Sequence, residues 1–160
     1  MKQTIIGILF FFFLTGSLLA NTGNQFGIGL SLFYPTGISM KYNISPDLGV
    51  EGTLGYVGSR SHLHAQILYN FYKVPGSNPV NLYVGGGFLM QERTKKEKVW
   101  KWIKTESNTW VPGLRVPFGV SIFPGGKQFE IFAEINLNLF MNGEYGGSDL
   151  GLALGGRVYF

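Results

Sequence analysis

Apolar residues recur at every second position over most of this chain, and this spacing constrains its fold more than any other feature. The alternation is cleanest between Phe129 and Leu139, where one face carries Phe129, Ile131, Ala133, Ile135, Leu137 and Leu139. The other face carries Glu130, Phe132, Glu134, Asn136 and Asn138. A helix would scatter these residues around its circumference, whereas a strand separates them onto two sides. The pattern therefore predicts β-strands with one apolar face.

Segments with the same period of two cover nearly all of the chain after residue 24. They are Gln25–Phe33, Gly37–Ile44, Asp47–Val57, His62–Tyr72, Val80–Met90, Trp110–Ile122, Phe129–Leu139 and Asp149–Phe160. Pro- and Gly-bearing turns separate them. Each segment has roughly the ten residues that a tilted strand needs to cross a bilayer. We therefore predict an all-β fold, an eight-stranded antiparallel up-and-down transmembrane β-barrel, without repeats or a second domain.

The side chains on the two faces indicate which face lies inside the barrel. One face collects very small residues, among them Gly27, Gly29, Ser31, Ser39, Gly85, Gly87, Gly119 and Gly155. A water-exposed exterior would instead carry long charged side chains, while the narrow lumen of an eight-stranded barrel needs small ones. The small face is predicted to line the lumen and the apolar face to contact lipid.

Aromatic residues near the strand ends fit two interfacial belts. One belt is predicted to contain Tyr42, Phe71, Phe123, Phe129 and Phe160. The other is predicted to contain Phe33, Tyr56, Trp110 and Phe140.

The N-terminal residues have the layout of a secretory signal peptide. Lys2 precedes an apolar stretch from Ile5 to Leu14, and Ala20 offers a small residue for cleavage. A single membrane anchor is the alternative, but Thr15, Gly16 and Ser17 interrupt the apolar run short of the ~20 residues a spanning helix needs. We predict a signal peptide over 1–20 and a barrel domain over 21–160. The absence of Cys excludes disulfides and a lipidation cysteine.

Positive charge is concentrated in one predicted outer loop, residues 91–109. This segment carries the whole net charge of +3 that the chain retains without Lys2. Its candidate binding residues are Arg93, Lys95, Lys96, Lys98, Trp100, Lys101, Trp102 and Lys104. The stretch Lys98–Lys104 alternates strongly enough to extend the hairpin beyond the membrane.

Two interpretations of this loop remain open. Its lysines could touch lipopolysaccharide phosphates while the tryptophans settle at the interface. Alternatively, the loop could bind an anionic glycan, a lipid head group or a partner such as a host protein, because Trp offers an anchor and lysines steer acidic ligands.

Six charged residues fall on the predicted lumen face. They are Lys41, Glu51, Arg115, Glu130, Glu134 and Arg157, three cations and three anions. An unpaired charge in so confined a space would be costly, so we expect a hydrogen-bonded ion-pair network that fills the barrel. Such a barrel would not conduct as a wide pore.

Other candidate chemistry is sparse. His62 and His64 lie two residues apart on the lumen face, but no third metal ligand accompanies them at suggestive spacing, so ordinary hydrogen bonding is the preferred interpretation. Gly85–Gly87 is not a phosphate loop, because no helix follows it. Pro112 and Pro117 interrupt the sixth segment, and we expect a β-bulge or local kink near Pro117. The sequence predicts neither a catalytic residue nor a cofactor.

Several short segments resemble a family of small, mostly uncharacterised bacterial outer-membrane β-barrel proteins, similar in layout to the transmembrane domain of OmpA. They are Tyr34–Tyr42, Leu63–Tyr69, Leu114–Gly119, Ile131–Glu134 and Gly155–Phe160. The resemblance implies an outer-membrane location among lipid and lipopolysaccharide. It also implies that the last strand, ending in Tyr159 and Phe160, is recognised by the barrel assembly machinery.

The preferred function is that of a monomeric outer-membrane barrel with a structural or surface-interaction role and no nucleic-acid partner. Three alternatives stay open: a small-solute pore, a secreted lipocalin-like binding barrel and an enzyme that modifies lipid A. Ser59–His64 faintly resembles the Ser and His of outer-membrane lipid A deacylases. Those enzymes place their nucleophile on the lipid-facing surface, whereas these histidines are predicted to point inward.

Overall fold

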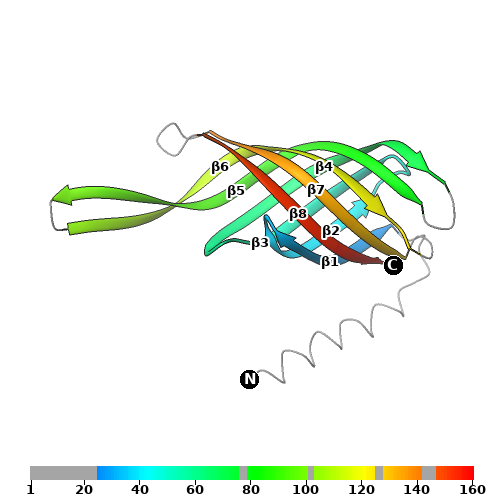
Figure 1. Cartoon of the computed structure of the whole chain (residues 1–160), viewed down its shortest axis with the longest axis horizontal. Helices are drawn as coiled ribbons and strands as arrows, with labels where there is room; N and C mark the ends of the chain where they lie inside the picture. Colours follow the sequence, from blue (N-terminus) through cyan, green and yellow to red (C-terminus); the bar gives the residue numbers. More distant parts are fainter. Residues whose placement is uncertain (1–24, 76–78, 101–102, 125–127, 142–146) are drawn as a thin grey trace, which may run out of the picture.

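The computed structural model describes residues 25–75, 79–100, 103–124, 128–141 and 147–160, and of residues 94–100 and 103–107 it describes the backbone alone. The strands are β1 (Phe26–Phe33), β2 (Thr36–Asn43), β3 (Leu48–Val57), β4 (Arg60–Val74), β5 (Val80–Trp100), β6 (Ile103–Ile122), β7 (Phe129–Phe140) and β8 (Gly147–Tyr159). Each pairs antiparallel with the next, and β8 pairs with β1, which closes the barrel (Figure 1). This confirms the predicted fold. Among the described residues no helix is long and apolar enough to cross a bilayer.

Strands β5 and β6 run well past the bounds that the sequence predicted, Val80–Met90 and Trp110–Ile122. Their pairing continues outward to Trp100 and Ile103. The neighbouring ladders stop earlier, β4–β5 at His62 and Gln91 and β6–β7 at Gly113 and Phe140. The prediction of a loop over 91–109 was therefore wrong, while the predicted extension of the hairpin is confirmed. We call residues 92–100 and 103–110 the β5–β6 ribbon; Figure 1 shows it projecting past the other strands.

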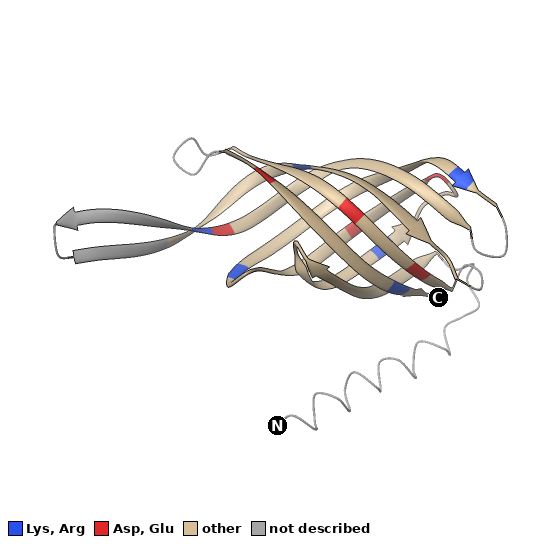
Figure 2. Cartoon of the chain, viewed as in Figure 1, with Lys and Arg blue, Asp and Glu red and all other residues tan. Residues whose placement is uncertain are grey.

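The two faces of the barrel follow the predicted alternation. Across β1 and β2, the pairs Ile28–Met40 and Leu30–Ile38 lie outside, and the pairs Gly27–Lys41 and Gly29–Ser39 lie inside. The strongly exposed large hydrophobic side chains include Phe88 and Leu150, 70% and 77% exposed. Charged residues are few along the barrel strands (Figure 2). An apolar exterior around a polar interior suits a lipid bilayer and is the reverse of what a lipocalin-like barrel needs, so that alternative is wrong.

Large side chains share the lumen with the small ones. Tyr83 pairs with Gly119, Phe132 with Gly155, and Tyr159 with Gly27. A Cβ built on Gly119 would lie 2.4 Å from the Tyr83 ring, and one on Gly155 would lie 2.4 Å from the Phe132 ring. Each aromatic ring thus occupies the space that a glycine on the next strand leaves empty.

Two aromatic residues lie elsewhere than the predicted belts. Phe123 is only 8% exposed, and its ring centroid lies 6.0 Å from that of Tyr159 inside the barrel. Phe140 is equally buried and packs under the guanidinium of Arg93. Period two continues through both residues onto the inward face, and this outweighs the position of the rings near strand ends.

Proline is accommodated in β6 without a register shift. Pairing of β5 with β6 is interrupted between Val84–Phe118 and Gly87–Arg115, and the register is the same on both sides of the gap. A bulge at Pro117 is therefore wrong, and the irregularity there is the interrupted β5–β6 pairing. One register shift in the barrel wall lies between Asn70 and Tyr72 instead.

Hydrogen-bond directions along β6 explain how both prolines fit. Directly after β6, the Phe123 amide donates to the carbonyl of Pro79, the residue before β5, while the Pro112 carbonyl accepts from the Met141 amide beyond β7. Because directions alternate along a strand, odd-numbered residues of β6 point their amides to β5 and even-numbered ones to β7. The missing N–H of Pro117 thus falls in the β5–β6 gap, and that of Pro112 falls at the end of the β6–β7 ladder.

Candidate functional site

Arg157 of β8 is the centre of an ion-pair cluster in the lumen. Its guanidinium lies 2.7 Å from the Glu51 carboxylate of β3 and 3.0 Å from the Glu130 carboxylate of β7. Lys41 pairs with Glu130 at 3.0 Å, and the Tyr159 hydroxyl donates to Glu130 at 2.6 Å. The charged side chains are at most 3% exposed. Four strands, β2, β3, β7 and β8, are thereby tied together across the barrel.

Arg115 of β6 forms a second cluster with polar partners from three strands. It pairs with Glu134 at 2.7 Å and donates to Gln66 at 3.0 Å and to Asn138 at 3.2 Å. The Tyr83 hydroxyl also donates to Glu134, at 3.3 Å. The structure thus brings the six sequence-predicted lumen charges together as two neutralised clusters, each completed by neutral polar groups.

The rings of Phe132 and Tyr83 pack against cations of these clusters. The Phe132 ring centroid lies 3.9 Å from the guanidinium carbon of Arg157, a cation–π contact. Sequence reasoning described the lumen face by its small residues and so missed the contribution of these rings. The signal available in the sequence was their parity, since Phe132 alternates in step with Glu130 and Glu134.

His62 and His64 lie between the Glu51 side chain and the outer end of the barrel. Their facing ring nitrogens, Nε2 and Nδ1, are 3.1 Å apart, and His64 Nε2 lies 4.0 Å from Glu51. Each side chain is 2% exposed and points into the lumen. Within the described part of the chain, no group of three His, Cys, Asp or Glu side chains is placed to hold a metal ion.

The outer end of the barrel carries a third polar cluster, which fastens the foot of the ribbon. Arg93 forms an ion pair with Asp149 of β8, and its guanidinium carbon lies 3.7 Å from the Phe140 ring centroid. Tyr34, in the turn between β1 and β2, donates to Asp149 at 3.2 Å and to Gln91 at 3.4 Å. Burial of the Tyr34 side chain is the main cause that raises its pKa, and the nearby Asp149 carboxylate is the second. The hydroxyl therefore keeps its proton and donates.

Most of the predicted surface-binding residues fall outside what the structure describes. Arg93 alone has a described side chain, and it is used in the outer cluster. The side chains of Lys95, Lys96, Lys98, Trp100 and Lys104 lie outside the described part, as do Lys101 and Trp102 entirely. The backbone places Lys95, Lys96 and Lys98 on β5 and Lys104 on β6, in paired register.

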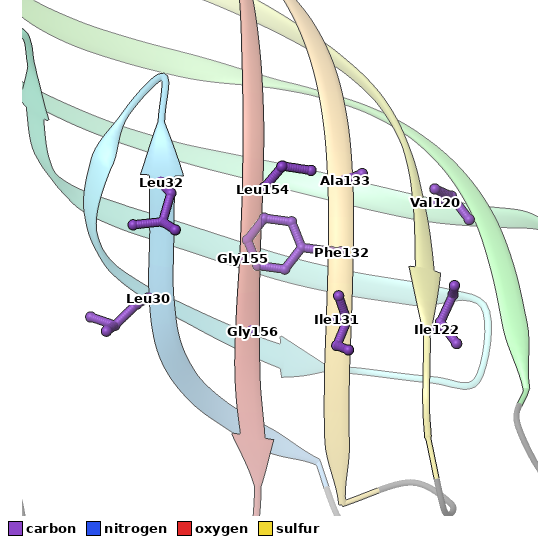
Figure 3. A pocket seen from close by; sticks show the side chains of 10 residues that line it. All are labelled: Leu30, Leu32, Val120, Ile122, Ile131, Phe132, Ala133, Leu154, Gly155 and Gly156. Atoms are coloured by element: carbon purple, nitrogen blue, oxygen red, sulfur yellow. The ribbon is translucent and has the colours of Figure 1, made fainter.

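The lipid-facing surface carries a shallow apolar groove of about 400 Å³ across β1, β8, β7 and β6 (Figure 3). The small residues Ala133 and Gly156 leave space there between the side chains of Leu30, Leu154 and Ile131. A groove with this lining suits hydrocarbon. A lipid A deacylase would need a histidine on the lipid-facing surface, and neither His62 nor His64 lines this groove.

The terminal strand ends with one inward and one half-buried aromatic residue. Tyr159 is 3% exposed and points into the lumen, while the Phe160 amide donates to the Phe26 carbonyl at 2.9 Å. The last two residues are thus integrated into the closed wall of the barrel.

Two solved structures of bacterial proteins have a similar fold. The N-terminal β-barrel domain of Pseudomonas aeruginosa OprF is similar with a TM-score of 0.64 and 16% identity, over 85% of this chain and 96% of that one. Neisserial surface protein A is similar with a TM-score of 0.51 and 18% identity, over 85% and 94%. No protein-family model matches the sequence. No curated protein sequence matches it either. The similarity confirms the predicted fold of a small β-barrel.

Proposed function

We propose that this chain is a monomeric outer-membrane barrel with a closed lumen, which holds the β5–β6 ribbon above the membrane as a surface for an anionic partner. Its apolar exterior and its structural likeness to outer-membrane barrels support the location. In this proposal residues 1–20 direct export and are removed, and Tyr159 and Phe160 close the strand that the assembly machinery recognises. No enzymatic step, cofactor or nucleic acid is involved.

The ribbon is the observation that carries the proposal. Its strands pair with each other for the length of a membrane-spanning strand, past the last pairs of β4 and β7. The outer cluster of Arg93, Asp149 and Phe140 fastens its foot to the barrel. An excess of Lys over Glu along it attracts anionic groups such as phosphates, sulfates and carboxylates.

The packing of the lumen supports a closed barrel rather than a pore. A cavity of about 580 Å³ opens at the end of the barrel opposite the ribbon and reaches Lys41. Beyond it lie Glu130 and Arg157, both 1% exposed or less. Ions crossing the barrel would have to separate charge pairs that hold each other at 3.0 Å.

The inward position of the histidines argues against the lipid A enzyme. Such an enzyme would have to present a histidine and a nucleophile to lipid on the outer wall. His62 and His64 are enclosed among Glu51, Tyr34 and Gln91 instead.

Replacing Thr94–Asn108 by Asn-Gly tests the proposed surface role. The two new residues suit a type I′ turn between Arg93 and Thr109, which are paired in the native ribbon and point their backbone groups toward each other. Arg93 and its contacts are retained, while the excess positive charge is removed. We expect the variant to fold and reach the surface, but to lose salt-sensitive binding of fluorescent dextran sulfate and polyglutamate to intact cells.

A second variant, which loses the same net charge as the Asn-Gly variant but keeps the ribbon, separates the effect of charge from the effect of the ribbon backbone. Lys95→Gln, Lys96→Gln and Lys98→Gln together keep the chain length and should weaken the same binding. Cells that express the Asn-Gly variant and still bind both polyanions in a salt-sensitive manner would show that the partner surface lies elsewhere.

A further inference from the structure

The β5–β6 ribbon has two outer edges that no described strand covers. Pairing of β5 with β4 ends at Gln91, so the residues of β5 after Gln91 are not paired with β4. Pairing of β6 with β7 begins at Gly113, and before it the Met141 amide donates to the Pro112 carbonyl. Each edge therefore presents a row of backbone N–H and C=O groups that can pair with another strand. In Figure 1 no other strand runs beside the projecting part.

The two edges differ in sequence. On β5, residues 93–98 contain Arg93, Lys95, Lys96 and Lys98 with one Glu, and closely spaced lysines are a common protection of strand edges against pairing. On β6, residues 103–109 read Ile-Lys-Thr-Glu-Ser-Asn-Thr, with one cation, one anion and a β-branched residue at three positions. The β6 edge is therefore the one suited to accept a strand.

Hydrogen-bond direction identifies the groups that face outward on β6. Odd-numbered residues of β6 point to β5, as the bond from Phe123 to Pro79 shows, and the register holds without a shift as far as Lys98 and Lys104. Lys104 and Glu106 thus point their backbone groups away from β5, whereas Thr105 and Ser107 point theirs toward it.

We propose that an extended acidic segment of a partner protein adds to the ribbon as a strand along the outer edge of β6. Backbone hydrogen bonds to Lys104 and Glu106 hold it, and the surplus of lysine on β5 selects its negative charge. A second copy of this chain is disfavoured as the occupant, because pairing would bring together two copies of the segment 91–109, each with a net charge of +3. The inference rests on the proposed surface role and specifies the chemistry of the partner.

The test uses the full-length protein in lipid nanodiscs and two synthetic peptides. One peptide alternates valine and glutamate over about eight residues, which matches the length of the edge. The other has the same sequence with alternate backbone amides N-methylated, so its charge is unchanged but one edge cannot pair. We expect the methylated peptide to bind at least about tenfold more weakly, as the loss of one or two net hydrogen bonds implies.

Proline placement in the protein gives the matched variants. Glu106→Pro removes an outward N–H and should weaken binding of the plain peptide about fivefold, whereas Glu106→Ala retains that N–H and should not. Ser107→Pro removes an N–H that faces β5 and should also open the ribbon, seen as faster tryptic cleavage at its lysines.

Three results with the peptides would overturn the inference: equal binding of both peptides, undiminished binding by Glu106→Pro, or no binding of the plain peptide above that of an uncharged valine–threonine control. Dimerisation of the protein through the ribbon would also overturn it, in favour of a second copy. Equal binding of both peptides that still disappears in the Asn-Gly variant would leave the proposed surface role intact, so the two failures are distinguishable.

Discussion

Arg157 neutralises carboxylates on β3 and β7, and Arg115 neutralises the Glu134 carboxylate on the neighbouring strand β7. Replacement of either by Ala would leave a buried carboxylate without its partner, which costs about 3–5 kcal/mol. Lys73→Ala is the control, because Lys73 is paired with Asp47 at the exposed end of the barrel and such pairs contribute at most about 1 kcal/mol. Urea unfolding in lipid vesicles measures the difference. Similar stability of all three variants would mean that the lumen is hydrated enough to solvate lone charges.

Gly29 and Gly86 should respond to alanine with opposite signs. A Cβ on Gly29 would lie 1.8 Å from the Gly156 carbonyl oxygen, so Gly29→Ala forces two backbones apart and should destabilise by about 1–3 kcal/mol. A Cβ on Gly86 would have no atom within 4 Å, so Gly86→Ala should be neutral or stabilise by up to about 1 kcal/mol. The same unfolding assay ranks the two. A stable Gly29→Ala would contradict the close approach of β1 and β8.

Particular residues show what the sequence could and could not predict. Parity alone placed Lys41, Glu51 and Arg157 in the lumen, because a strand offers only two faces. Which carboxylate each cation contacts depends on strand stagger and closure, so the pairing of Arg157 with both Glu51 and Glu130 could not be derived from spacing. Phe123 and Phe140 were assigned to the interfacial aromatic belts by their position near strand ends, although the same parity rule placed them inside.

At the scale of the strand, β6 tolerates the lack of a backbone N–H at Pro117 but should not tolerate it at Val116. Pro117 lies in the gap of the β5–β6 ladder, whereas the Val116 amide points to β7, where the ladder is intact at Leu137. Val116→Pro should therefore abolish the folded, fast-migrating band of unheated samples on a gel, while Pro117→Ala should keep it. A folded Val116→Pro would disprove the assigned direction of hydrogen bonding.

At the scale of the whole molecule, the paired charges predict an insulating barrel. Purified protein in planar bilayers should give no steady channels in the nanosiemens range, because the lumen is filled by neutralised side chains from six strands. The Asn-Gly variant should behave in the same way, since the ribbon is no part of the lumen. Steady channels that persist in that variant would assign the conductance to the barrel itself and favour the small-solute pore.

The place of Arg157 on the last strand has a consequence for the order of assembly. Its two carboxylate partners sit on β3 and β7, and the pair with Glu51 spans the barrel only once β8 lies beside β1. Before β8 is in place, the lumen would carry an excess of negative charge. Arg157 of β8 neutralises this excess. Closure of the barrel and neutralisation of the lumen carboxylates then occur in the same step. A chain truncated before Arg157 should therefore remain an open sheet.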